Sequence, residues 1–148
     1  MKKSLSSIIG GLAGAAALNL VHQAVKAFDH EAPRVDLVGE EALSKGLEKI
    51  KIDPPTGNAL FTVTMAADLI SNAAYFSLTG LAKKKHLIAV GAATGLAAGV
   101  GALALPKYMG LSDAPVTRTV KAKALTVGWY TLGGLVAGVV IKSLRDQN

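Results

Sequence analysis

Apolar residues fill four long stretches of this chain, and short polar segments separate them. The stretches cover residues 4–28, 59–82, 87–105 and 120–144. Each has about the 20 residues that an α-helix needs to cross the hydrocarbon core of a bilayer. The pattern therefore predicts an all-α fold: a single transmembrane domain over residues 1–148, built as an integral membrane four-helix bundle.

The first stretch has a second possible interpretation. It begins with Lys2 and Lys3, continues as an apolar run, and carries small residues at Val25 and Ala27. Such a sequence is also typical of a secretory signal ahead of its cleavage site. The apolar run is long for a signal, however, and we interpret it as the first transmembrane helix.

The polar segment 29–58 is the only sizeable hydrophilic part of the chain. It holds seven acidic and four basic side chains, a net charge of −3. Within it, Leu43, Leu47 and Ile50 recur at helical spacing, with charged residues on the other faces. The pattern predicts a short amphipathic helix over 39–50 that lies on the membrane surface or caps the bundle.

Basic residues cluster at the ends of the apolar stretches, which is the pattern of membrane topology signals. The net charge of +6 therefore does not point to nucleic acid. With both termini cytoplasmic, one side of the membrane would hold Lys2, Lys3, Lys83, Lys84, Lys85, Lys142 and Arg145. We predict this orientation, with segment 29–58 outside, in a bacterial inner membrane. Bases near the opposite ends weaken the asymmetry: Lys107, Arg118, Lys121 and Lys123.

Asp68 lies near the middle of the second apolar stretch, where a carboxyl group is costly. Asn72 follows one helical turn later and Tyr75 two turns later, so the three share one helix face. Counting depth in each span, we expect a ligand-binding or ion-binding cluster made by Asn19, His22, Asp68, Asn72, Tyr75, Lys123, Thr126 and Tyr130. The alternative is a buried hydrogen-bond network that only fixes helix register.

The state of Asp68 depends on its partners. We expect its carboxyl group to be buried and hydrogen-bonded, with Asn19 and His22 as partners from the first span. It would either stay protonated, because burial raises a carboxyl pKa, or ionise beside a protonated His22 or Lys123.

Glycines recur every four residues in three of the spans. The rows are Gly10 and Gly14; Gly91, Gly95 and Gly99; and Gly134 and Gly138. Such rows let helix backbones approach closely, which drives helix packing in lipid. We predict packing within one bundle; the alternative is a homodimer or partner interface through the third span.

The sequence holds little that indicates catalysis. It has no cysteine, which excludes disulfides and thiolate chemistry, and no G-x-S-x-G, H-E-x-x-H or P-loop motif. We expect no cofactor and no metal site. The predicted function is a non-enzymatic binding or accessory protein that holds a lipid, a hydrophobic ligand or a partner helix. The alternative is a small transporter or channel, possibly dimeric, in which Asp68 handles an ion or proton.

Overall fold

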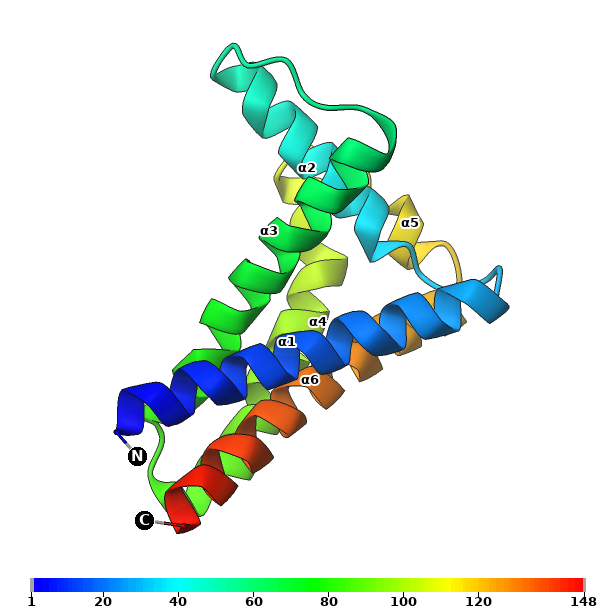
Figure 1. Cartoon of the computed structure of the whole chain (residues 1–148). Helices are drawn as coiled ribbons and strands as arrows, with labels where there is room; N and C mark the ends of the chain where they lie inside the picture. The colour runs from blue at the N-terminus through cyan, green and yellow to red at the C-terminus, as the bar shows by residue number, and fades with distance from the viewer. Residues whose placement is uncertain (1, 148) are drawn as a thin grey trace.

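The computed structural model describes residues 2–147, and these residues form helices and connecting loops without a strand (Figure 1). In chain order the elements are α1 (Lys3–Phe28), α2 (Val35–Lys49), α3 (Gly57–Ser77), the 3₁₀ helices η1 (Leu78–Leu81) and η2 (Lys84–His86), α4 (Leu87–Tyr108), α5 (Ala114–Thr117) and α6 (Val120–Asp146). By length and composition, α1, α3 with η1, η2 with α4, and α6 are long and apolar enough to cross a membrane. The all-helical class and the four long apolar helices are thus confirmed.

Several boundaries differ from the predicted ones. The sequence predicts that the third span ends ahead of Pro106, but α4 continues through this residue to Tyr108. Proline removes only its own N–H, and the Met109 amide still donates to the Leu105 carbonyl at 3.0 Å. The predicted polar loop before the fourth span contains the short helix α5, which has Pro115 in its first turn, where proline is tolerated.

The helix in the polar segment begins four residues earlier than predicted. The amphipathic pattern placed it over 39–50, whereas α2 begins at Val35. Asp36 lies in the first turn, where a negative charge is favourable to the helix dipole. The position of α2 outside a membrane remains a prediction.

The long helices form an open arrangement. α1 packs against both α3 and α6, and α6 packs against α4. α3 and α4 make few direct contacts, although only a short turn separates them in sequence. The order around the bundle is therefore α3, α1, α6, α4, with a gap between the first and the last. Figure 1 shows both termini close to the turn after α3, whereas α2 and α5 lie at the other end.

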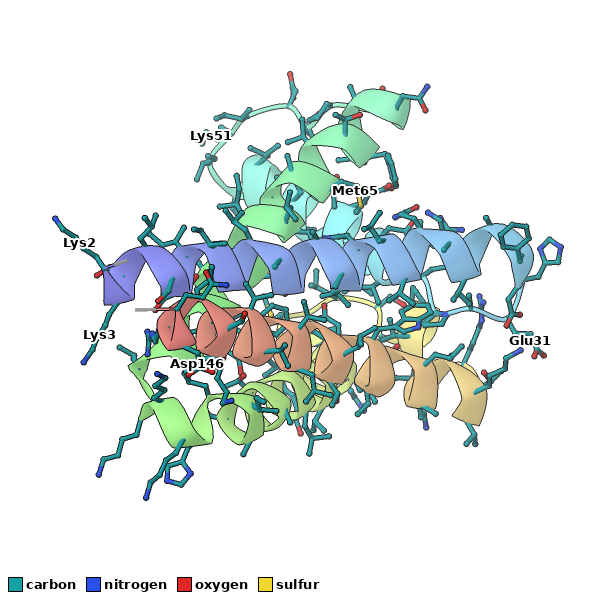
Figure 2. The ribbon with its side chains drawn as sticks, turned by 60° about the horizontal axis from the view of Figure 1, so that its bottom comes forward. Lys2, Lys3, Glu31, Lys51, Met65 and Asp146 are labelled. Carbon is teal, nitrogen blue, oxygen red and sulfur yellow. The ribbon has the colours of Figure 1, made fainter. Side chains whose placement is uncertain are left out.

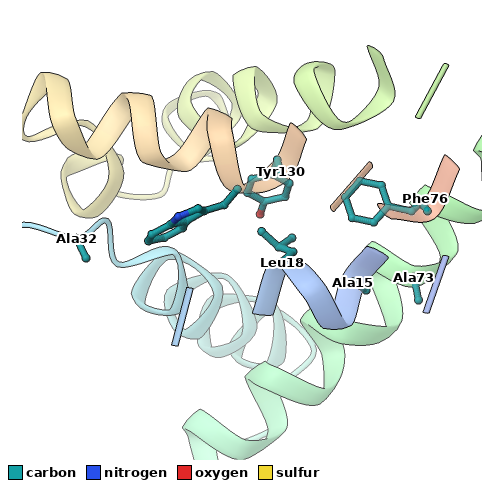
Figure 3. Close-up of a cluster of buried hydrophobic side chains, with 8 residues drawn as sticks. Ala15, Leu18, Ala32, Ala73, Phe76 and Tyr130 are labelled. Carbon is teal, nitrogen blue, oxygen red and sulfur yellow. The ribbon is translucent and has the colours of Figure 1, made fainter. Parts of the chain in front are cut away.

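The hydrophobic core lies between α1, α3 and α6 (Figure 3). Ala15 of α1 and Phe76 of α3 are completely buried, and Leu18, Trp129 and Tyr130 are nearly so. These side chains fix the relative positions of the three helices that carry the whole predicted polar cluster.

Glycines bring the backbones of α4 and α6 into contact. A Cβ atom on Gly95 would lie 2.8 Å from the Cα atom of Thr131, and one on Gly99 would lie 2.8 Å from that of Val127. Gly91 faces the backbone of Gly134 in the same way. The groove in the third span is thus covered by α6 of the same chain, so this row offers no free groove to a second copy or partner helix.

Glycines on α1 make similar contacts with α6. A Cβ atom on Gly10 would lie 3.0 Å from the Ala137 carbonyl oxygen, and one on Gly14 would lie 3.0 Å from the Ala137 Cβ. On α6, Gly138 faces the backbone of Leu87. Close approach of α6 to both neighbours therefore depends on these small residues.

Polar contacts tie the two ends of the bundle. At one end, the Arg145 guanidinium donates to the Ser6 hydroxyl at 3.0 Å and the Gly80 carbonyl at 2.9 Å. At the other end, Lys121 pairs with Asp29 at 2.6 Å. Figure 2 shows Lys2, Lys3 and Asp146 at the first end and Glu31 at the second. These contacts join α6 to both ends of α1 and to η1, the turn after α3.

Candidate functional site

A cavity of about 510 Å³ lies between α3 and α4, with α2 across one end. Small and apolar side chains make most of its wall. Residues from five segments line it: Val35, Val38, Gly39 and Ala42; Asp68, Ser71, Asn72 and Tyr75; Ala97, Ala98, Gly101, Ala102, Leu105, Pro106 and Met109; Leu111 and Val116; and Tyr130. The cavity exists because α3 and α4 separate while both stay attached to the rest of the bundle.

The cavity opens between the two helices that flank it. Ser71 of α3 and Ala97 of α4 both line it and are exposed at the surface. Nearer the turn after α3, the gap is closed by hydrogen bonds to Thr94: the Tyr75 hydroxyl donates to its carbonyl at 3.0 Å, and the Thr79 hydroxyl lies 3.1 Å from its hydroxyl. The opening is therefore lateral, between α3 and α4.

Asp68 is the only ionisable carboxyl group on the cavity wall among the described residues. The Asn72 amide, one helical turn away, donates to its carboxyl oxygen at 2.9 Å. The Asn19 amide of α1 also interacts with this carboxyl group and donates to the Ala15 carbonyl at 3.1 Å. Asp68 and Asn72 thus form a small polar group on a mostly apolar wall, and Asn19 of α1 is bonded to this group from outside the wall.

His22 lies on the far side of this group, away from the large cavity. Its ring packs on the Trp129 ring with centroids 5.2 Å apart, and its Nε2 atom is 3.6 Å from an Asp36 carboxyl oxygen. The expected direct partnership of His22 with Asp68 is replaced by this contact with Asp36. The reason is that the first turn of α2 lies against α1, where Lys26 also donates to Asp36, and no pattern in the spans indicates that contact.

The remaining members of the expected cluster separate into two groups. Tyr75 and Tyr130 line the cavity together with Asp68. Thr126 is buried, but its hydroxyl donates to the Ala122 carbonyl of its own helix at 2.8 Å. Lys123 is exposed on α6 and is not among the lining residues.

The residue that sequence reasoning missed is Asp36, whose side chain is completely buried. Arg34 donates to its carboxyl oxygens from Nη2 at 2.7 Å and from Nε at 2.9 Å, and Lys26 of α1 donates at 3.1 Å. Burial raises the pKa of this carboxyl, but these hydrogen bonds and charges outweigh burial and bring the pKa to about 2. Asp36 is therefore a buried carboxylate held between two cations.

Asp36 was missed because it is one of seven acidic residues in a segment that looks solvated. One signal could have found it. Val35, Val38 and Ala42 recur at helical spacing across the start of α2 and predict an apolar face there. A helix that buries this face also turns its first residues towards the bundle.

The fold and the site together define a class: an all-helical protein with four long apolar helices of membrane-spanning length and a mostly apolar lateral cavity. Comparison of the chain with protein-family models, with curated proteins and with solved structures finds no match. Function must therefore be argued from the site itself.

Proposed function

We propose that this chain is a small membrane protein that binds a hydrophobic ligand with one polar head group. The observation that carries the proposal is the cavity of about 510 Å³, whose wall is apolar apart from a few convergent polar groups. Its volume lies within the roughly 300–1,000 Å³ of ligand pockets, and this mixture of apolar wall and few polar groups is typical of them. Asp68 and Asn72 would recognise the head group.

The lateral opening supports a lipid-like ligand. With the four long helices across a bilayer, the gap between α3 and α4 would face acyl chains, so an apolar ligand would enter without crossing water. A carboxyl group accepts hydrogen bonds and favours a cation when ionised. We therefore propose an amphiphile whose head group is an amine or another hydrogen-bond donor.

For orientation, we propose that both termini are cytoplasmic and that α2 lies outside. Both termini and the Lys83–Lys85 turn lie at the same end of the bundle, so their positive charges act together. Reporter fusions at Lys84 and Glu48 should report opposite sides of the membrane. The same side for both would eliminate the four-span topology.

A small transporter is the second candidate function. It is favoured by the position of Asp68, which lines the large cavity on one side and a smaller cavity towards His22 on the other. In this case Asp68 would handle a proton or ion. Proteoliposomes that show a flux abolished by Asp68→Asn would favour transport over binding alone.

Native mass spectrometry of the full chain in mild detergent tests the binding proposal, with dodecylamine and dodecanol as probes. Ala98→Phe should fill the cavity and abolish both adducts. Ala93→Phe, at an exposed position on the same helix, should retain them. Asp68→Asn should weaken the dodecylamine adduct about tenfold, the effect of losing roughly 1.4 kcal/mol, and leave dodecanol unchanged. Equal binding by Ala98→Phe and the parent would overturn the proposal.

A further inference from the structure

A second, much smaller cavity lies behind Asp68, on the side away from the ligand cavity. Its volume is about 20 Å³, and it is enclosed between α1, α2 and α3. The polar residues on its wall are His22, Asp36, Thr64 and Asp68; the others are Val35, Gly39 and Met65. Two carboxyl groups from different parts of the chain therefore border the same small space.

Two polar atoms at this cavity are buried without a hydrogen-bond partner in residues 2–147. They are the Nε2 atom of His22 and the hydroxyl oxygen of Thr64, in residues that are 4% and 3% exposed. An Asp36 carboxyl oxygen lies 3.6 Å from His22 Nε2, which is too long for a hydrogen bond. Such buried groups normally have a partner, either in the protein or in an ordered water.

Thr64 differs from other threonines within the long helices. The hydroxyl groups of Thr62, Thr126 and Thr131 all donate to the carbonyl four residues earlier in their own helix, at 2.7 to 2.8 Å. The hydroxyl of Thr64 makes no such bond. It is therefore available to a partner in the small cavity.

The size of the small cavity and the polar groups on its wall indicate what would bind Thr64 there. A water molecule needs about 10–15 Å³ and two to four polar contacts, and this cavity provides both. Water can donate and accept, so it suits the imidazole, the hydroxyl and both carboxyl groups. An added cation is disfavoured, because Lys26 and Arg34 already neutralise Asp36.

We infer that this cavity is a binding site for one water molecule, which bridges His22 Nε2 and the Thr64 hydroxyl between Asp36 and Asp68. The water gives Asp68 a hydrated connection to the Asp36 cluster that does not pass through the large cavity. The charged or titratable groups around it are His22 and Lys26 from α1, Asp36 and Arg34 from the α2 end, and Asp68 from α3. The inference does not depend on any ligand in the large cavity.

Water-edited solid-state NMR of the full chain in phospholipid bilayers tests this inference. Magnetisation from water should reach the His22 imidazole and the Thr64 side chain rapidly, although both are buried. The dry core residues Ala15 and Phe76, which are 0% exposed, provide the baseline. Transfer to His22 and Thr64 at the slow rate of these two residues would overturn the site.

A matched pair of variants then tests the bridge. Thr64→Val removes the hydroxyl and should slow water transfer to His22 at least threefold, whereas Thr62→Val, on the same helix with an exposed side chain, should leave it unchanged. Transfer to His22 unaffected by Thr64→Val would show that the hydroxyl does not hold the water. Filling the large cavity by Ala98→Phe should leave transfer to His22 intact, so failure of this site and failure of the ligand proposal are distinguishable.

Discussion

The two faces of α4 carry similarly small residues and yet form opposite kinds of structure. Towards α6, Gly91, Gly95 and Gly99 lie against backbone atoms. Towards α3, Ala98 and Ala102 line a cavity of about 510 Å³. Small residues therefore do not by themselves specify close packing. They permit it where two backbones converge, and they leave a hollow where backbones diverge.

The two faces of α4 differ because its neighbours, α6 and α3, are packed differently against the rest of the bundle. α6 packs against α1 and α4 at once, so its backbone is held close to the glycine row. α3 packs mainly on α1 and makes few contacts with α4, and residues of α2 line one end of the cavity between α3 and α4. The buried carboxylate Asp36 links α2 to Lys26 of α1.

The same substitution placed on the two faces should have very different effects. Gly95→Leu forces a side chain into the α6 backbone and should destabilise the fold by roughly 3 kcal/mol or more, since no flexible atom can yield there. Gly101→Leu projects from a cavity-lining position where the nearest obstacle is the Leu105 side chain at 3.4 Å, and it should cost less than about 1 kcal/mol. Thermal unfolding in detergent measures both.

A glycine with open space provides the control for this pair. A Cβ atom on Gly128 of α6 meets no atom within 4 Å, so Gly128→Ala should stay within about 0.5 kcal/mol of the parent or stabilise it slightly. Equal stability of Gly95→Leu and Gly128→Ala would show that α4 and α6 are not packed through the glycine row.

A smaller loss of stability is expected from a substitution at Asp36, the buried residue that joins α2 to α1. Asp36→Asn leaves Lys26 and Arg34 without their buried counter-ion and should cost about 2 kcal/mol. Glu48→Gln, an exposed change on the same helix, should cost less than about 0.5 kcal/mol. Unfolding in detergent measures both, and a loss no larger in Asp36→Asn would show that this carboxylate does not hold α2.

The pH dependence sharpens this test. The folded-state pKa of Asp36 is lowered from 3.8 to about 2, so its ionised form stabilises the fold. That contribution is complete above about pH 4 and is lost as pH falls through about 2. The stability difference between the parent and Asp36→Asn should therefore shrink over this window. A difference independent of pH would contradict the role of the charge.

Several features could be predicted because they depend on residues close in sequence. The four long helices follow from length and hydropathy alone. The Asp68–Asn72 hydrogen bond at 2.9 Å follows from a spacing of four residues on one helix. Tyr75 faces the cavity with Asp68 for the same reason. It lies seven residues after Asp68, which is about two helical turns, so both side chains are on the same face of α3.

Features that join distant segments could not be predicted in this way. His22 was expected beside Asp68, but its place against Asp36 depends on where the first turn of α2 meets α1. Thr126 and Lys123 have the right depth and spacing for the cluster, yet one bonds its own helix and the other faces outwards. The depth of a residue along a helix can be predicted from the sequence. The direction in which its side chain points depends on how the helix is rotated about its axis, and that rotation is set by the neighbouring helices.

The sequence by itself determined that this protein is helical, with four apolar helices of membrane-spanning length and a polar group built on Asp68. Only the tertiary structure decided that α3 and α4 stand apart, that Asp36 is buried between Lys26 and Arg34, and that a cavity forms below α2. The physical reason is that these features depend on interactions of different range along the chain. Helix formation and hydropathy act over one or two turns, but cavities and buried ion pairs arise where segments far apart in the chain meet.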